Sequence, residues 1–241
     1  MCDGVTVCVE ARSCGSNSAR AAHRARTALA VPARMPHPTV APRTTTLTTR
    51  LREATASVRD DREILAGRVS WLDYRLYLLR MYGFYTSIER TLTSSRQLAA
   101  VVADAPLRNH KAALVAHDLV ALGVDRTELA GVPRMAFAPQ LALPEALGWT
   151  YVVESATLTG RQLARHLARQ LPEEIQVASA YLRCYGEVVQ DRWRELGTAL
   201  DAFEDIERDG DRVVEAARDG FLRLHAWVRP AVQPRPSRIH A

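Results

Sequence analysis

From about residue 44 onward, the hydrophobic positions of the chain recur with the period of an α-helix. Between Leu47 and Glu63, apolar side chains follow one another at helical intervals, at Leu47, Leu51, Ala54 and Val58. This spacing places them on one side of a helix. The threonines before Leu47 are suitable N-caps, and no glycine or proline interrupts the run. The pattern predicts a first core helix over Leu47–Glu63.

Six further segments show the same periodicity, separated by short breaks at glycine, proline or serine. The predicted helices cover residues 71–92, 97–103, 111–123, 145–171, 181–200 and 211–228. Ser70 is placed to cap the first of these. No run alternates strictly between polar and apolar residues, which argues against a sheet. About seven helices with short loops predict an all-α fold with a single helical domain over residues 44–229.

The first 43 residues differ from the rest in composition. They are rich in Ala, Arg, Ser and Pro, and they carry four of the five net positive charges of the chain. This resembles a transit peptide, but there is no continuous apolar segment for secretion. We predict a disordered basic extension over residues 1–43, with Met35 as a second candidate start, and a disordered tail over residues 230–241. The nearly neutral domain between them predicts no nucleic-acid partner.

Cysteine spacing and hydropathy bear on metal binding, on membrane insertion and on the cellular compartment. Cys2, Cys8 and Cys14 are spaced six residues apart, which matches no common zinc motif, so no metal site is predicted. No apolar run approaches the roughly 20 residues that cross a bilayer, so we predict no membrane span. A chain without a disulfide framework is expected in the reducing cytoplasm.

Common catalytic motifs are absent from the sequence. There is no G-x-S-x-G, Walker A, G-x-G-x-x-G or H-E-x-x-H pattern, and no Glu-x-x-His pair for a di-iron site. His166 lies near the basic end of the predicted long helix, where a histidine can meet the last carbonyl groups. These absences remove the enzyme classes that are simplest to recognise.

The predicted long helix contains an unusual run of small residues. They are Ser155, Ala156, Thr157, Thr159 and Gly160. Small side chains allow a flat ligand to approach the helix backbone. They equally allow a close crossing with another helix, and the spacing by itself favours that structural explanation.

Four segments, in order along residues 47–228, together resemble the heme oxygenase family in its bacterial, biliverdin-producing form. The first is residues 52–55 with Glu63, which flank the place where the family has its proximal histidine. The second is Tyr74–Glu89, a helix rich in aromatic residues with its core at Leu79–Tyr85. The third, Tyr151–Leu167, resembles the distal helix, and the fourth combines Tyr185-Gly186 with Trp193-Arg194.

The resemblance implies a particular site and reaction. In the family, one helix supplies an axial histidine to heme iron, and a distal helix kinked at glycines lies against the macrocycle. Heme is cleaved to biliverdin, carbon monoxide and iron, with electrons from an external donor. The resemblance further places Arg52 where the family has a basic residue near a heme propionate, and Arg194 is a plausible second contact. Arg59 could itself pair with a carboxylate in the same pocket. All three arginines could instead be solvated residues on helix surfaces.

The sequence departs from the family at the proximal and distal positions. Arg59 stands at the proximal histidine position, and a protonated guanidinium has no lone pair for iron. Ser155 and Thr159 replace the two kink glycines, so only Gly160 remains. Ala156 occupies a site where relatives have a polar side chain.

These departures predict a heme oxygenase relative with impaired or lost turnover. We expect it to bind a tetrapyrrole such as heme, another flat carboxylated ligand, or a protein partner such as a bilin photoreceptor. No catalytic residue is assigned. The predicted ligand-binding residues are Arg52, Arg59, Ser155, Ala156, Thr159, Gly160 and Arg194. The alternatives are an active heme oxygenase with a substitute axial ligand and an external electron donor, and a heme-free interaction protein with a filled pocket.

Overall fold

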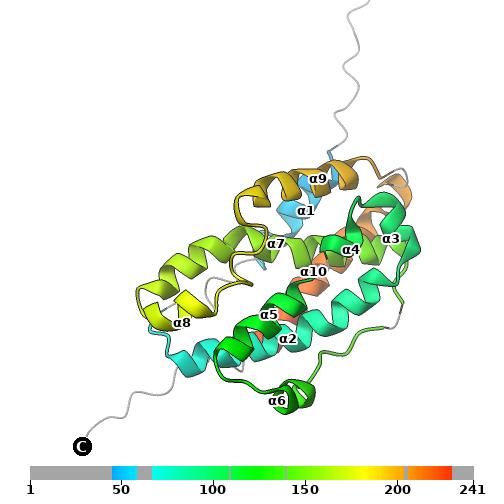
Figure 1. Cartoon of the computed structure of the whole chain (residues 1–241). Helices are drawn as coiled ribbons and strands as arrows, with labels where there is room; N and C mark the ends of the chain where they lie inside the picture. The colour runs from blue at the N-terminus through cyan, green and yellow to red at the C-terminus, as the bar shows by residue number, and fades with distance from the viewer. Residues whose placement is uncertain (1–44, 59–66, 109, 139, 204–205, 230–241) are drawn as a thin grey trace, which may run out of the picture. The chain divides into compact units, whose positions relative to one another are not determined.

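The computed structural model describes residues 45–58, 67–108, 110–138, 140–203 and 206–229, without the side chains of residues 106, 107 and 206. Within these ranges all regular secondary structure is helical, which confirms the all-α prediction (Figure 1). The elements are α1 (Leu47–Thr55), α2 (Trp71–Thr93), α3 (Arg96–Val101), α4 (Ala105–Arg108), α5 (Lys111–Ala121), α6 (Arg126–Gly131), α7 (Leu143–Ala168), α8 (Pro172–Val177), the 3-10 helix η2 (Gly186–Val188), α9 (Val189–Asp201) and α10 (Ile206–Val228).

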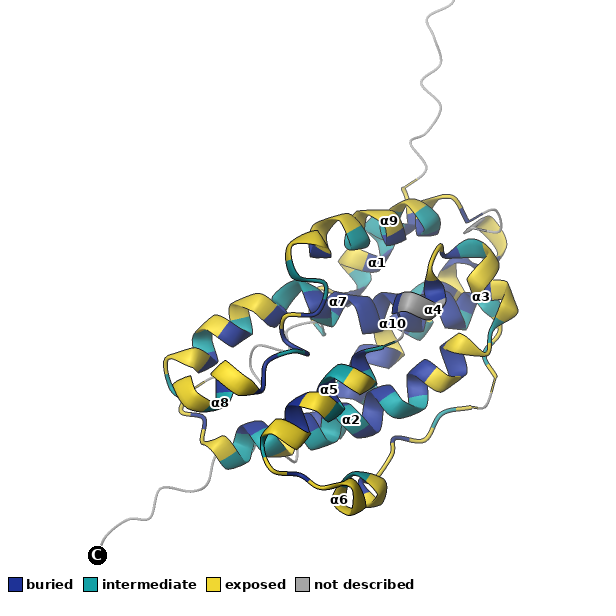
Figure 2. Cartoon of the chain, in the orientation of Figure 1, coloured by how far each residue is buried: buried dark blue, intermediate teal, exposed yellow. Residues whose placement is uncertain are grey.

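The long helices α7 and α10 form the centre of the helical unit. They pack against each other, while α1 and α2 contact α10 and α5 lies on α2. Their close approach depends on glycine: a side chain at Gly148 would collide with the backbone of Val213, and one at Gly220 would collide with Val152. Figure 2 shows that buried residues concentrate on these central helices, whereas α6 is largely exposed.

The start of α2 follows the prediction. Ser70 caps the helix by accepting the backbone N–H of Asp73 at 3.2 Å, and the Asp73 carboxylate accepts the N–H of Ser70 at 2.9 Å. This reciprocal capping box satisfies two donors that the first turn leaves unpaired. The inward face of α2 then buries aromatic residues, including Tyr74, Phe84 and Tyr85.

Helix α1 is shorter than predicted, because its described part ends at Thr55 rather than continuing toward residue 63. The Thr55 hydroxyl donates to the carbonyl of Leu51 at 2.8 Å. Beyond it, the N–H groups of Ala56 and Val58 bond three residues back instead of four. Such tightening is typical of a helix end. Arg59 and Glu63 lie outside the described residues.

The helix predicted over residues 181–200 is wrong in its first part. Residues 180–185 form turns, Tyr185 has a φ of +65°, and α9 begins only at Val189. The Asp118 carboxylate accepts the N–H groups of Ala180 and Tyr181 at 2.8 and 2.9 Å, which holds this segment to α5. Side-chain contacts thus override the helical periodicity.

Three short helices, α4, α6 and α8, were not predicted, and none of the described helices is long and apolar enough to span a membrane. The described helices belong to one compact unit, Thr44–Ala241. The exact domain limits at residues 44 and 229 stay a prediction, because they adjoin segments outside the description.

Candidate functional site

A half-open cavity of about 390 Å³ lies between α1, α7 and α9. We call it the arginine pocket, because Arg52 from α1 and Arg194 from α9 both line it. Its other lining residues are Thr48, Tyr151, Gln190, Trp193, Leu196, Gly197, Thr198, Leu200 and Asp201. Most of this wall belongs to α9, while α7 contributes a single residue.

The orientation of α1 follows from its two faces. Leu47 and Leu51 are fully buried, which turns the opposite side toward solvent. Thr48 donates its N–H and its hydroxyl to the Asp201 carboxylate, both at 2.8 Å, and so ties the start of α1 to the end of α9. Arg52 lies one turn after Thr48 and therefore lines the same pocket.

Helix α9 supplies an aromatic surface and the second arginine. Leu196 and Leu200 are buried, and Trp193 packs on Tyr151 with ring centroids 5.2 Å apart. The exposed Arg194 guanidinium is 2.7 Å from the Asp191 carboxylate on the same helix. An exposed pair of this kind is weak and can exchange its partner for a ligand carboxylate.

The chemistry of the pocket suits a carboxylated aromatic ligand. Among the described residues, Arg52 has no ion-pair partner, so its guanidinium is available for a bidentate contact with a carboxylate. Trp193 is partly exposed and offers ring surface to a flat molecule, while Tyr151, which is 2% exposed, packs behind it. None of the described lining residues is a histidine, cysteine or methionine. The carboxylate end of a heme is therefore matched by this pocket, whereas an axial nitrogen or sulfur ligand is not among its lining residues.

The other described residues of the predicted set do not line this pocket. Ser155 lies one turn beyond Tyr151 on α7, and its hydroxyl donates to the Val152 carbonyl at 2.8 Å. Thr159 makes a longer contact of 3.4 Å with the carbonyl of Ala156. Such bonds within a helix satisfy the hydroxyl groups locally. Arg59 lies outside the described residues; among the described members of the predicted set, Arg52 and Arg194 line this pocket together.

Gly160 has a packing role that the sequence alone did not distinguish from a ligand contact. A side chain there would collide with the backbone carbonyl of Leu182. The segment after α8 thus approaches α7 at this glycine. The small residue at Gly160 thus permits a close backbone contact, as the structural explanation requires, but the partner is a turn and not the expected second helix.

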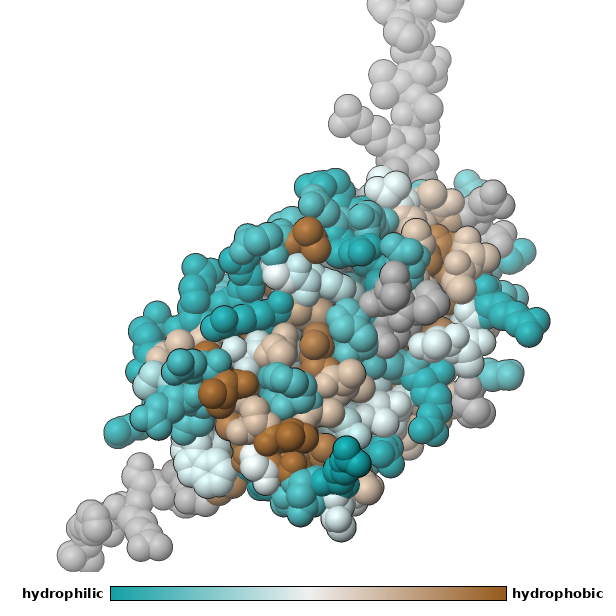
Figure 3. All heavy atoms as spheres, viewed as in Figure 1, coloured by the Kyte–Doolittle hydropathy of each residue, from teal (hydrophilic) through white to brown (hydrophobic). Residues whose placement is uncertain are grey.

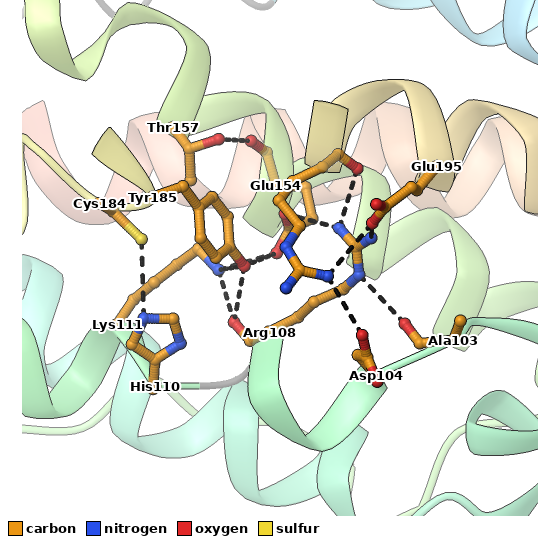
Figure 4. Close-up of polar contacts among 11 residues, drawn as sticks. Ala103, Asp104, Arg108, His110, Lys111, Glu154, Thr157, Cys184, Tyr185 and Glu195 are labelled. Carbon is orange, nitrogen blue, oxygen red and sulfur yellow. Dashed lines mark hydrogen bonds and ion pairs between the residues drawn. The ribbon is translucent and has the colours of Figure 1, made fainter. Parts of the chain in front are cut away.

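A second group of residues, unpredicted as a site, lies behind the pocket on the other side of α9. We call it the buried polar cluster, consisting of Glu89, Arg108, Lys111, Glu154 and Tyr185 (Figure 4 shows all but Glu89). Lys111 is fully buried, and its ammonium group donates to Glu154 at 2.8 Å, to the Arg108 carbonyl at 2.6 Å and to the Tyr185 hydroxyl at 3.3 Å. All three donors of this cation are therefore used.

The anionic members of the cluster are equally well paired. Glu154 accepts from Lys111, from the Tyr185 hydroxyl at 3.1 Å and from Arg108 at 3.4 Å. Glu89 accepts the backbone N–H groups of Lys111 and Ala112 at 2.6 and 3.2 Å, and so caps the start of α5. One feature of the sequence could have indicated this cluster. Glu154 is a charged residue that directly follows the apolar run Tyr151–Val153.

Burial shifts the acidity of several groups around the cluster. It raises the pKa of Glu89 to about 7, although the N–H of Ala112 and the charge of Lys111 oppose the rise. It also raises the pKa of the Cys184 thiol to about 11, which disfavours a reactive thiolate. The pKa of Tyr185 is raised as well, by burial and by the neighbouring Glu154 carboxylate. Within the described residues, no group of three or more His, Cys, Asp and Glu side chains could hold a metal ion.

Comparisons with known proteins agree with this architecture. The sequence model of the heme oxygenase family matches residues 45–230. The structure is similar to heme oxygenase from Neisseria meningitidis, solved with NO and CO bound, with a TM-score of 0.65 and 20% sequence identity. That match covers 78% of this chain and 93% of the Neisseria chain. A search of curated proteins gave no match.

The family model spans well over half of the chain, and the helices it covers form the fold of a solved heme oxygenase. The resemblance seen in four segments of the sequence is thereby confirmed. The chain belongs to the heme oxygenase family.

Proposed function

We propose that this protein binds a flat, carboxylated tetrapyrrole through Arg52 and Arg194, and that its capacity to cleave heme is impaired or lost. The observation that carries the proposal is the convergence of these two arginines, from α1 and α9, on one pocket with an aromatic wall. Two guanidinium groups match two carboxylates, and each charged hydrogen bond contributes about 1.5 to 3 kcal/mol.

The impairment follows from the residues at the family's proximal and distal positions. Arg59 replaces the proximal histidine and offers no lone pair to iron. Ser155 and Thr159 add side chains where relatives use glycine, and their hydroxyls bond to their own helix. A bound heme would supply the iron at which oxygen reacts. Arg52 and Arg194 would hold the carboxylates of such a ligand and Trp193 would cover part of the ring, but the described lining residues include no histidine, cysteine or methionine for the iron.

Two alternatives are less well supported. A substitute axial ligand, for example a histidine from another helix, would have to reach the pocket, yet none of the described histidines lines it. A heme-free protein that binds only a partner, such as a bilin photoreceptor, needs a suitable surface. On the face shown in Figure 3, hydrophobic residues occur in small patches among hydrophilic ones. Isolated exposed residues such as Val120 and Val177 are normal for a soluble surface.

The test is an equilibrium titration of the full chain with hemin, and separately with biliverdin, followed by absorption. We expect saturable binding, and a loss of affinity of about tenfold in each of Arg52→Gln and Arg194→Gln. Arg218→Gln, which changes an exposed arginine on α10, is the matched control and should bind like the natural chain. Equal affinity of all three variants would overturn the assigned pocket. If neither hemin nor biliverdin binds, the proposal of a tetrapyrrole ligand is overturned and the heme-free alternative is favoured.

A further inference from the structure

Helix α9 has two functional sides. Arg194, Thr198 and Asp201 are spaced at i, i+4 and i+7, so they form one stripe along the helix, and this stripe lines the arginine pocket. Arg192 and Glu195 lie off this stripe and contact the region of α4 instead. The same helix thus presents one side to the ligand and another to buried charges.

The apolar attachment of α9 is small. Of its thirteen residues only Val189, Leu196 and Leu200 are buried. Trp193 and Ala199 also pack against the core, and the carboxylate of Asp201 accepts from Thr48, so these contacts hold the pocket side and the C-terminal end of the helix. A directional contact on the other side adds the point that sets the orientation of Trp193 and Arg194.

Arg108 supplies that directional contact. Its guanidinium donates to the Glu195 carboxylate at 2.8 Å and to the backbone carbonyl of Arg192 at 3.0 Å, which are two points on consecutive turns of α9. The same group reaches Glu154 of α7 at 3.4 Å and the carbonyl of Ala103 at 3.3 Å. Only 3% of the Arg108 side chain is exposed, so its fork is held rigidly (Figure 4).

Stability alone does not account for this arrangement. Removing an arginine, a lysine and a glutamate from water is costly, and apolar residues of similar volume often stabilise a core equally well or better. What charged hydrogen bonds add is geometry, because their donors and acceptors must align. The cluster includes Tyr185 in a left-handed conformation, which is strained for a bulky residue and is held by its hydroxyl contacts with Glu154 and Lys111.

We propose that Arg108 is a positioning residue for the arginine pocket. Through Glu195 and the Arg192 carbonyl, it sets the orientation of α9, and thereby places Arg194 and Trp193 to meet a ligand together with Arg52. This inference rests on the proposed function for its effect on ligand affinity. Its effect on α9 itself does not depend on any ligand.

The experiment compares three variants by hemin titration and by hydrogen exchange of the peptide 189–201. Arg108→Met removes the fork, and we expect hemin affinity to fall by between tenfold and a hundredfold, because small misplacements of binding groups are costly. Arg108→Lys keeps the charge but cannot reach both points on α9, so an intermediate loss is expected. Glu195→Gln weakens one contact and should cost about threefold.

The matched control is Glu128→Gln. Glu128 accepts from Arg75 at 2.7 Å and its side chain is 49% exposed, against 2.8 Å and 51% for Glu195 with Arg108. Glutamine also remains suitable for the capping box of α6. This control should leave affinity and the exchange of α9 unchanged. Since Glu195 is half exposed, Glu195→Gln is expected to fold even if Arg108→Met does not.

A double-mutant cycle between Arg108 and Arg194 distinguishes a positioning role of Arg108 from a general loss of structure. In the Arg194→Gln background, Arg108→Met should cost much less affinity than in the natural chain, because the contact it positions is already gone. Additive losses, or unchanged affinity in the Arg108 and Glu195 variants, would overturn the proposal. If the natural chain does not bind hemin, the proposed function fails.

The positioning role of Arg108 is then tested by hydrogen exchange of residues 189–201 alone. Exchange should be several-fold faster in Glu195→Gln and unchanged in Glu128→Gln. Equal exchange rates in the two variants would overturn the positioning role.

Discussion

The charged residues on the two sides of α9 differ in their exposure and in their ion-pair partners. In the arginine pocket, Arg52 has no ion-pair partner among the described residues, and Arg194 has only an exposed one. In the buried polar cluster, Lys111 and Arg108 each make several hydrogen bonds, and no charge is left alone. Cations that are exposed and underpaired are available to a ligand, whereas cations that are buried and satisfied hold the scaffold. The buried group of charges therefore serves as the framework, and the exposed, underpaired group is the proposed binding site.

The largest effect is expected from breaking the cluster at its most buried cation. Lys111→Met leaves the Glu154 carboxylate, which is 1% exposed, without its nearest positive partner. We expect a loss of about 3 to 5 kcal/mol in the free energy of unfolding, measured in urea. Lys111→Met combined with Glu154→Leu should recover part of this loss, because no unpaired carboxylate remains. A double variant no more stable than the single one would contradict this view of the cluster.

A pH dependence should follow from Glu89. Its folded pKa of about 7 lies above the ordinary 4.5, so the folded state retains a proton that the unfolded state has lost. Stability is therefore highest below about pH 4.5 for this group and falls as the pH rises to 7, by up to about 3 kcal/mol. Urea unfolding between pH 5 and 8 should show a smaller fall in Glu89→Gln. Glu187→Gln, at an 85% exposed side chain, should keep the natural slope.

Gly160 lies in a closely packed contact with the turn at Leu182, whereas Gly197 lies on the open wall of the arginine pocket. Gly160→Ala should destabilise the protein by about 1 to 3 kcal/mol, because the new methyl group meets the Leu182 carbonyl. Gly197→Ala, on the pocket wall of α9, meets only Thr48 at an ordinary 3.6 Å. This second change should raise stability by about 0.5 to 1 kcal/mol. Thermal unfolding of both variants measures the two changes. Melting temperatures that shift in the same direction by similar amounts would contradict the expected difference.

A similarly small effect is expected at the link between α1 and α9. Asp201→Ala removes the acceptor of the Thr48 N–H and hydroxyl, but both of these groups can turn to water. We expect a loss of about 1 kcal/mol. Chemical unfolding measures it, and Asp191→Ala, which removes the exposed partner of Arg194, serves as the comparison with a near-zero change.

The sequence predicted the helices and missed the cluster for the same physical reason. Apolar periodicity reports which side of a helix is buried, so α2, α5, α7 and α10 were found close to their true positions. Periodicity says nothing of a charged residue whose partners are distant in the chain. Glu154 meets Lys111 and Arg108 only after folding, and the turn at Tyr185 depends on them.

Local signals that sequence reasoning passed over also exist. Asp125 and Glu128 form a capping box, which is a recognisable start for α6. For the site, the family resemblance paired Arg52 with Arg194, and the structure places both in one pocket. The predicted roles of Ser155, Ala156 and Thr159 stay predictions, and Arg59 lies outside the described residues.

The most direct test of the central claim is a turnover assay with the natural chain. Protein loaded with hemin is mixed with ascorbate and oxygen, and the absorption of the Soret band and of biliverdin is followed. We predict bound hemin without appreciable biliverdin, and a gain of biliverdin when Arg59→His is combined with Ser155→Gly and Thr159→Gly. Stoichiometric biliverdin from the natural chain, with histidine-like spectra of the bound hemin, would contradict the account.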